Sequence, residues 1–454
     1  MKSFFTTVMF TLSVLSLMAQ DAPPPRQITV DEAVRLAMEQ NLNLKIEDNK
    51  NQVLRRNRDF ALNRFIPSLT ASATLSRLNE QQKITSFDTS LMPPYISTKT
   101  IEIDPWTLGL NFSAQLPLSL ALFRGIEQTV IEYDNGLLTY FIAQRRLERD
   151  VRKLFNQILA LEEAVKITQL RLENARTRYL QADEAYRAGR LQEINALQAR
   201  VAWENTKPTL REQELSLETL KMNFKMLLGI ELNENIVFVG DIKAVSFTLP
   251  LTPQSLQRLL DQRLDVMNIG ANIRSLENVI QLQKDSLLPN LILMFSMDPS
   301  LAEPFNADSW SKENAWKQRG GMFSISLSWK LDSLIPGSQA WVNIKNLEDQ
   351  LEQLRLTLAQ VKMASAVDLL SLVQRIQKYR ESLAALEANV NLAQRVVQLS
   401  NNAYRAGLQS LSEVQDAELQ LQSAGLQLIN EKISLNNSIL DLIYSLDFKE
   451  GENQ

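Results

Sequence analysis

The feature that most limits how this chain can fold is an internal duplication. The pentapeptide AYRAG at residues 185–189 recurs at 403–407, a shift of 218 residues. The stretch from Ile28 to Leu69 parallels the stretch from Leu251 to Leu291, at a shift of 222 to 223 residues. Two separate matches with nearly the same offset indicate one duplicated unit. We therefore divide the chain into a first repeat at 21–250, a second repeat at 251–446 and a C-terminal tail at 447–454.

Residues 1–20 have the pattern of a secretory signal peptide. Lys2 is followed by an apolar run from Phe4 to Met18, and then by Ala19 and Gln20. The run is shorter than the roughly 20 residues that a spanning helix needs, which disfavours a membrane anchor. The sequence contains no Cys, so we expect an exported protein without a lipid at its N-terminus.

The composition excludes several classes of function. With no Cys and no His, the chain cannot use thiol catalysis, disulfides, His-based acid–base chemistry or most kinds of zinc site. Its net charge of −4, with both signs interleaved, gives no basic face for a nucleic acid. We predict no catalytic residue, no metal site, no cofactor and no nucleic-acid partner, and we do not expect an enzyme.

Each half is predicted to contain the same order of elements. A helix comes first and ends before Pro67 or Pro289, because proline cannot continue a helix. Two short strands follow, then a very long helix and a shorter one. The first half has predicted helices at 29–64, 126–188 and 191–228, with strands at about 68–78 and 105–116. The second half has predicted helices at 253–287, 338–406 and 410–446, with strands at about 290–298 and 320–330.

Three of the predicted strands alternate between apolar and polar residues, whereas the strand at 290–298 is more uniformly apolar. Trp106, Leu108 and Leu110, for example, interleave with Thr107 and Gly109. A period of two indicates a strand that separates two environments. In a soluble sandwich the apolar face would be a core; in an exported protein the pattern favours a membrane barrel, with lipid on one side and a lumen on the other. We expect polar loops at 79–104 and 299–319, on the outer face.

The two long helices carry apolar residues at alternating spacings of three and four. The series runs from Leu147 to Tyr186 in the first half and from Ile344 to Val361 in the second. This is the pattern of a coiled coil. At roughly 1.5 Å per residue the two helices would be about 95 and 100 Å long, which is too long for an ordinary globular core. Pro208 is expected to kink the helix at 191–228.

Four motifs resemble the TolC family of outer-membrane efflux proteins. They are the opening helix 28–37 followed by Asn41 and Leu42, the tetrapeptide 66–69, the tripeptide 227–229, and the turn 404–408 with its following residues Glu413, Val414, Asp416 and Ala417. The resemblance covers about 28 to 446. It implies a mainly α protein with a transmembrane β-barrel. Long antiparallel coiled coils form a tunnel, and each protomer gives four strands to a 12-stranded barrel in a homotrimer.

The resemblance also implies a location and partners. The protein would lie in the outer membrane of a Gram-negative bacterium, in contact with its lipid, and would extend into the periplasm. Its partners would be a periplasmic adaptor (membrane fusion) protein and an inner-membrane transporter. The function would be that of a passive exit duct for efflux of small molecules through a tripartite pump. Two alternatives stay open: a type I protein-secretion duct of the same fold, and a periplasmic coiled-coil scaffold without a pore.

The two helix turns differ in charge. Glu413 and Asp416 lie six and nine residues after Gly407, whereas Asn195 and Gln198 hold the same positions after Gly189. Residues three apart share a helix face. The resemblance implies that this acidic pair lines a constriction of the pore, where six carboxylates around a three-fold axis would attract cations. The alternative is a pair of solvated surface charges.

The turns themselves are the candidate docking site for the adaptor. The resemblance places docking at the two tips, whose residues are Arg187, Ala188, Gly189, Arg405, Ala406, Gly407 and Leu408. Both glycines can adopt a positive φ, so a purely structural turn is part of this interpretation. Tyr404 is a possible gate contact against a neighbour near Asn195, and packing within the helix seam is the alternative.

Overall fold

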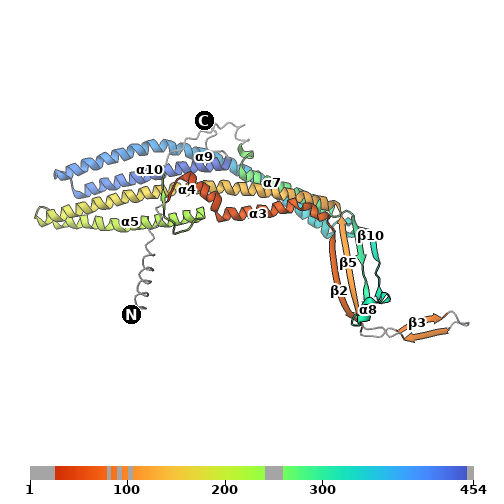
Figure 1. The fold of residues 1–454 in the computed structure, drawn as a ribbon. Helices are drawn as coiled ribbons and strands as arrows, with labels where there is room; N and C mark the ends of the chain where they lie inside the picture. The colour runs from red at the N-terminus through yellow and green to blue at the C-terminus, as the bar shows by residue number, and fades with distance from the viewer. Residues whose placement is uncertain (1–25, 79–82, 89–94, 101–105, 241–258, 447–454) are drawn as a thin grey trace, which may run out of the picture. The chain divides into compact units, whose positions relative to one another are not determined.

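The structure is a computed structural model that describes residues 26–78, 83–88, 95–100, 106–240 and 259–446 (Figure 1). The predicted signal peptide and the C-terminal tail lie outside these residues. The chain divides into two compact units. The first contains the chain up to Lys50, Leu138–Asn268 and everything from Leu358 on, and the second contains Asn51–Leu137 and Ile269–Thr357.

The second unit contains an antiparallel sheet whose four main strands come from both repeats. They pair in the order β2–β5–β7–β10. Ser68 lies opposite Gln115, and Ser328 lies opposite Asn290. The alternating segments therefore form strands near the predicted positions: β2 (Ser68–Arg77), β5 (Trp106–Leu118), β7 (Asn290–Met297) and β10 (Gly321–Ser328).

The segments predicted as loops contain regular structure, so that interpretation was wrong for the described residues. β3 (Lys83–Asp88) and β4 (Tyr95–Thr100) form an antiparallel hairpin. β7 covers β5 only from Phe112 onward, and β8 (Ser300–Ala302) pairs with Thr107–Gly109 of β5 beyond it. Because this part of β5 has backbone groups that β7 does not pair, β8 within the segment 299–319 can add to the sheet there. The remaining elements here are α8 (Ala307–Ser311), η2 (Glu313–Ala315) and β9 (Trp316–Lys317).

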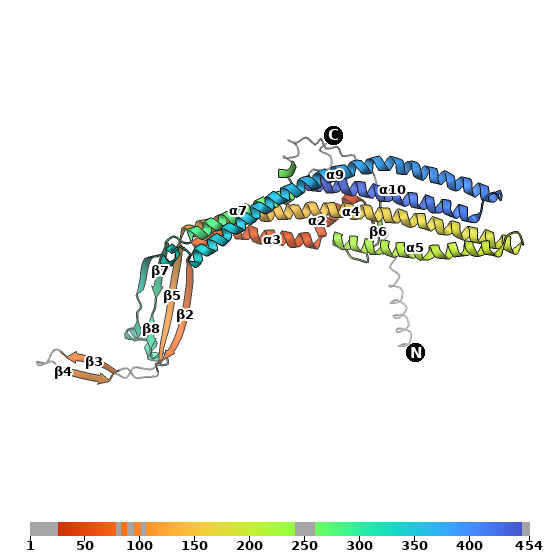
Figure 2. The ribbon, with the colours of Figure 1, turned by 180° about the vertical axis from the view of Figure 1, so that it is seen from behind.

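Two very long helices dominate the chain. They are α4 (Leu120–Arg187) and α9 (Gln339–Arg405), of 68 and 67 residues. In the first unit α4 runs beside α5 (Glu193–Leu228) and α9 beside α10 (Leu411–Leu446), as Figure 1 and Figure 2 show. α5 continues as one helix through Pro208. The helix predicted at 126–188 starts earlier, at Leu120, because the backbone N–H of Leu122 finds acceptors in the carbonyl and hydroxyl of Ser119.

The helix predicted at 29–64 is broken, which corrects that prediction. It consists of α2 (Val30–Gln40), α3 (Leu42–Asp59) and η1 (Ala61–Phe65). Asn41 has a non-helical ψ of 125°; its side-chain carbonyl accepts from the N–H of Leu44, and its amide donates to the carbonyl of Leu227. Asn41 therefore caps α3 and satisfies the end of α5 at the same time.

The helix predicted at 253–287 is also broken, at the equivalent place. The helical residues just before Arg263 are separated from α7 (Leu264–Asp285) by a break at that arginine. The side chain of Arg263 is buried and pairs with Asp265 at 3.1 Å and with Asp368 of α9 at 3.2 Å. A short helix, η3 (Leu331–Leu334), precedes α9.

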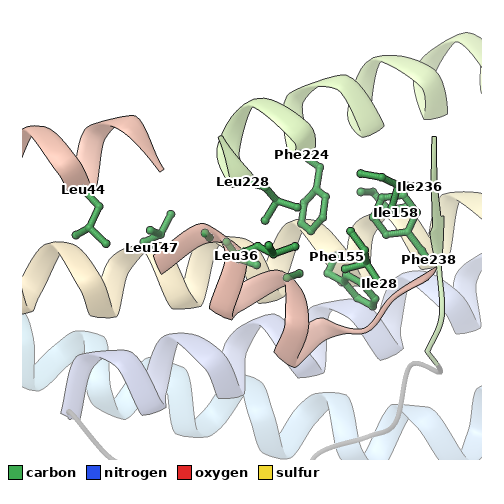
Figure 3. Packing of buried hydrophobic residues seen from close by; sticks show 13 residues of the cluster. Ile28, Leu36, Leu44, Leu147, Phe155, Ile158, Phe224, Leu228, Ile236 and Phe238 are labelled. Atoms are coloured by element: carbon green, nitrogen blue, oxygen red, sulfur yellow. The ribbon is translucent and has the colours of Figure 1, made fainter. Parts of the chain in front are cut away.

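The main core of the first unit lies where the two ends of the first repeat meet. β1 (Arg26–Ile28) pairs in parallel with β6 (Ile236–Phe238). Phe155 of α4, Phe224 of α5 and Phe238 of β6 pack in tilted and edge-to-face pairs, with ring centroids 5.3–6.1 Å apart (Figure 3). Aromatic pairs at this spacing add to the free energy of burial. The first repeat is thereby closed on itself.

Among the described residues, α9 is the one helix that is long and apolar enough, by length and composition, to cross a membrane. An 18-residue window in it has a mean hydropathy of 1.4, and 17% of that window is buried within the chain.

Candidate functional site

Both helix turns of the first unit are built by the same hydrogen bonds. At the first turn, the N–H of Gly189 donates to Tyr186 and the N–H of Arg190 donates to Ala185. At the second, Gly407 donates to Tyr404 and Leu408 to Ala403, at 2.9 Å each. This is the pattern of a Schellman motif, which needs a left-handed residue after the helix. The glycines supply it, with φ of 70° and 74°.

All seven residues predicted for the tips are exposed in the structure. Leu408 is the extreme case, with 81% of its surface accessible. Arg190 holds the equivalent place in the first turn, so the two tips differ in chemistry although their backbones match. Arg187 pairs with Asp183 at 2.8 Å, one turn back on the same helix.

Small side chains bring the two helix pairs together behind the tips. We call this group the tip cluster; its buried members are Ala182, Ala196, Ala199 and Leu411. Tyr404 packs against the tip cluster, as do Tyr179 and Leu191. Tyr404 thus contacts a cluster that contains Ala196, the neighbour of Asn195, within a single chain.

Glu413 caps the helix that it begins. Its carboxylate accepts from the backbone N–H of Ser410 at 2.6 Å and from the Ser410 hydroxyl at 2.9 Å. The N–H of Glu413 in turn donates to that hydroxyl, at 3.3 Å. This reciprocal arrangement is a capping box. The bond from the Ser410 backbone, followed by the bond from its hydroxyl, lowers the pKa of the exposed Glu413 carboxyl.

The capping box explains part of the asymmetry between the turns. In the first repeat, Gln192 occupies the N-cap of α5 and its side chain makes no capping bond. Asn195 stands where Glu413 stands in the second repeat. The sequence signal for this role is a serine three residues before a glutamate, which is the pattern of a capping box. Asp416 is exposed on the same helix face as Glu413.

A mostly buried ion pair joins the α4–α5 helix pair to the α9–α10 helix pair, about one helical turn beyond Ala182 of the tip cluster. Arg178 of α4 forms a bidentate pair with Glu418 of α10, with Nη1 to Oε2 at 2.6 Å. The two side chains are 14% and 16% exposed. Arg171, two turns along α4, donates to the amide oxygen of Gln422, and burial lowers the pKa of its guanidinium. Sequence reasoning missed the Arg178–Glu418 pair, because its partners are 240 residues apart.

The described residues offer no cluster of acidic side chains that could hold a metal ion. The arrangement at the tips consists of two exposed turns, a packed cluster, an acidic helix face and an ion pair between helix pairs. Such features can bind another protein, repel or attract ions, and hold two helix pairs together.

The outer membrane efflux protein family matches this chain over residues 33–229 and 255–446. The two matched segments fall in the two repeats. Among solved structures, the chain is similar to the CmeC outer membrane channel of Campylobacter jejuni, with a TM-score of 0.76, 16% identity and coverage of 94% of this chain and 87% of that one. No curated protein matches the chain significantly in sequence.

Two further channels have the same fold. For the open state of the MtrE outer membrane channel of Neisseria gonorrhoeae, the TM-score is 0.71 at 15% identity, with 92% and 88% of the two chains covered. For the outer membrane protein VceC of Vibrio cholerae it is 0.69 at 15% identity, with 92% and 97% covered. The resemblance to the TolC family and the fold class of helices with a β-barrel are confirmed. With both repeats matched, this chain belongs to the outer membrane efflux protein family.

Proposed function

We propose that the protein is a homotrimeric channel, a passive exit duct that carries small molecules through the outer membrane as the last part of a tripartite pump. The barrel would lie in the membrane and the helices would form a tunnel in the periplasm. The observation that carries the proposal is the four-stranded sheet, which exposes apolar side chains on one of its faces and whose two edges are unpaired among the described residues.

The sheet cannot stand alone in lipid. β2 pairs only with β5, and β10 pairs only with β7, so each has one edge whose backbone groups lack partners in the described chain. Phe323, Ile325 and Leu327 of β10 are 62–72% exposed. An apolar face favours lipid, yet an open edge in lipid costs several kcal/mol for each unsatisfied group. Pairing β10 of one copy with β2 of the next removes both edges.

Two helices carry apolar stripes that nothing in the described chain covers. On α5 the exposed residues follow a heptad spacing: Ile194, Leu197, Val201, Leu215, Met222 and Met226. On α9 they include Leu356, Met363, Val367, Leu370, Leu392, Val396 and Leu399. Heptad stripes of this kind pack against a second helix. A ring of three copies would cover the α5 stripe of one protomer with the α9 stripe of another.

The exposed turns are the proposed docking site for a periplasmic adaptor, and an inner-membrane transporter would supply the energy. Leu408 and the glycines leave room for close approach of another protein's helices. Because Leu408 is matched by Arg190 in the first turn, the two tips of each protomer would bind the adaptor differently.

The acidic pair and the contacts behind it form the proposed constriction and gate. Glu413 and Asp416 from three copies would place six carboxylates around the narrow mouth and attract cations. Opening would move α9 and α10 away from α4 and α5, so it would have to break the Arg178–Glu418 pair. Tyr404 and Asn195 remain proposed gate contacts.

Conductance in planar bilayers tests this function. The wild-type trimer is expected to form cation-selective channels, and Glu413→Ala with Asp416→Ala is expected to weaken the selectivity and the block by multivalent cations. The matched control, Asn195→Ala with Gln198→Ala, should change neither. Equal selectivity in the acidic double variant and in the control variant would mean that Glu413 and Asp416 are solvated surface charges. A pure trimer without conductance would favour the periplasmic scaffold without a pore. Translocation of a fused polypeptide in place of small molecules would favour the secretion duct.

A further inference from the structure

In the second unit, the segment that leads into β2 combines arginines with exposed apolar side chains. Four arginines, all within ten residues, lie at the end of α3 and in η1: Arg55, Arg56, Arg58 and Arg64. Phe60, Leu62 and Ile66 lie among and just after them and are 62%, 67% and 61% exposed. The first strand of the sheet begins at Ser68, two residues later.

Two of the four arginines are engaged and two are free. Arg58 donates to Asp59 at 2.6 Å and lies 3.9 Å over the ring of Tyr133. Arg55 also pairs with Asp59, at 3.6 Å. Arg56 and Arg64 are exposed, and neither has a carboxylate within ion-pair distance in the part of the chain that the structure describes.

Arg56 and Arg64 line one hollow between the end of α3, η1 and α4. The guanidinium of Arg64 lies directly on Gly125 of α4, where any larger side chain would overlap it. The wall of the hollow also contains Asn57, Asn63 and Phe60. Its one carboxylate, Glu132, accepts a hydrogen bond from Gln128 at 3.1 Å. Two unpaired cations against one carboxylate leave the hollow positive.

The position of this hollow follows from the length of the strands. Ten residues at about 3.4 Å each, tilted by about 40°, span roughly the 25 Å of an outer-membrane apolar band. The segment 55–66 therefore lies at the lipid–water boundary on the helical side. Trp329, which follows β10 at the same end, donates to the carbonyl of Leu287 at 3.0 Å, and tryptophan is typical of this boundary.

We propose that Arg56 and Arg64 bind the phosphate of an anionic phospholipid in the periplasmic leaflet, with Phe60, Leu62 and Ile66 at its acyl chains. Guanidinium groups bind phosphate through two parallel hydrogen bonds, which suits a headgroup at this depth. The second repeat lacks such a site, because Asn278 and Ser286 occupy the positions 222 residues later. Each protomer thus holds one lipid. This inference rests on the proposed function, which puts the sheet in the membrane.

Native mass spectrometry of delipidated, detergent-solubilised protein tests the proposal. Phosphatidylglycerol, phosphatidylcholine, lipid A and inorganic phosphate are each added to wild type and to Arg56→Gln with Arg64→Gln. At about a fivefold effect for each lost charge, the double variant should bind phosphatidylglycerol about 25-fold more weakly. The control Arg355→Gln removes an exposed arginine that pairs with Glu277 at 2.9 Å, and it should bind as wild type does.

Each outcome of this experiment either supports or contradicts the proposed lipid site. Three phosphatidylglycerol molecules per trimer, lost in the double variant alone, support the site. Equal binding by wild type and double variant, equal binding of phosphatidylcholine, a preference for lipid A, or binding of inorganic phosphate alone would overturn it. The oligomer mass and the conductance of the same preparation report on the proposed function separately. A conducting trimer without the lipid contradicts this inference only, and an absent trimer contradicts the function.

Discussion

Ser410 and Glu413 hold the start of α10 through their capping box, and the two groups can be separated by substitution. Ser410→Ala removes the N-cap hydroxyl, which contributes about 1 kcal/mol to a helix end. Amide exchange in the first turn of α10 should become faster, whereas Gln192→Ala in the first repeat should leave α5 unchanged, because Gln192 makes no side-chain capping bond. Equal effects in the two repeats would mean that the capping box does not stabilise the turn.

The charge of Glu413 sets the pH dependence of the same helix end. Its pKa in the folded chain is lowered from an ordinary value of 4.5. The stabilisation is therefore complete above pH 4.5 and is lost as the pH falls through the lower, folded value. The protection factors of these amides in wild type, which are corrected for the intrinsic pH dependence of exchange, should begin to fall below pH 4.5 and should be lowest below the folded pKa. Glu413→Gln should remove the pH dependence, and a variant that still showed it would assign the effect to another group.

The ion pair between Arg178 and Glu418 ties α4 to α10 where solvent scarcely reaches. Arg178→Gln leaves the Glu418 carboxylate buried without its cation, at a cost of about 3 kcal/mol to the closed arrangement. We expect higher basal conductance in bilayers and, in cells, entry of a large antibiotic. The charge swap Arg178→Glu with Glu418→Arg should restore closure in part. Arg187→Gln breaks the exposed pair with Asp183 and should not change the basal conductance. An equal leak in that control would mean that the Arg178–Glu418 pair is not part of the gate.

At the scale of the element, the ends of the helices are fixed by contacts that differ in kind. Gly229 ends α5 with a φ of 76°, and a Cβ there would overlap the backbone of Gln40 and Asn41. Gly189 has a similar φ of 70° with no atom within 4 Å of a Cβ. Thermal unfolding should show Gly229→Ala destabilising the protein far more than Gly189→Ala, which pays only about 1 kcal/mol of backbone strain. Equal decreases in the unfolding temperature of the two variants would mean that the backbone at the junction of α2, α3 and α5 moves to accommodate the added Cβ.

Local patterns predicted the elements, and long-range packing decided their interruptions. The strand β5 and the helix α4 were predictable because each carries its own periodicity over many residues. The breaks at Asn41 and Arg263 were not, because each depends on a partner far away, Leu227 for the first and Asp368 for the second. The Arg178–Glu418 pair is hidden for the same reason. The serine and glutamate of the capping box, three residues apart, could have been found.

For the whole molecule, the open sheet edges and the uncovered helix stripes lead to the same conclusion. Both are expected of a chain that assembles with its own copies, as we propose. Membrane barrels have no free edge, and coiled coils leave no bare heptad stripe. Three chains with four strands each satisfy both requirements, which links the sheet in the second unit to the helices in the first without any further assumption about the cargo.

Crosslinking between the two open strands tests this account most directly. The chain has no cysteine, so Ala73→Cys on β2 together with Ile325→Cys on β10 provides the only two thiols. A bifunctional maleimide applied to outer membranes should join one chain to the next and, at completion, give a covalent trimer and nothing larger on a denaturing gel. Each single-cysteine variant should stay monomeric. Products that stop at the monomer, or that continue beyond the trimer, would contradict a barrel closed by three copies.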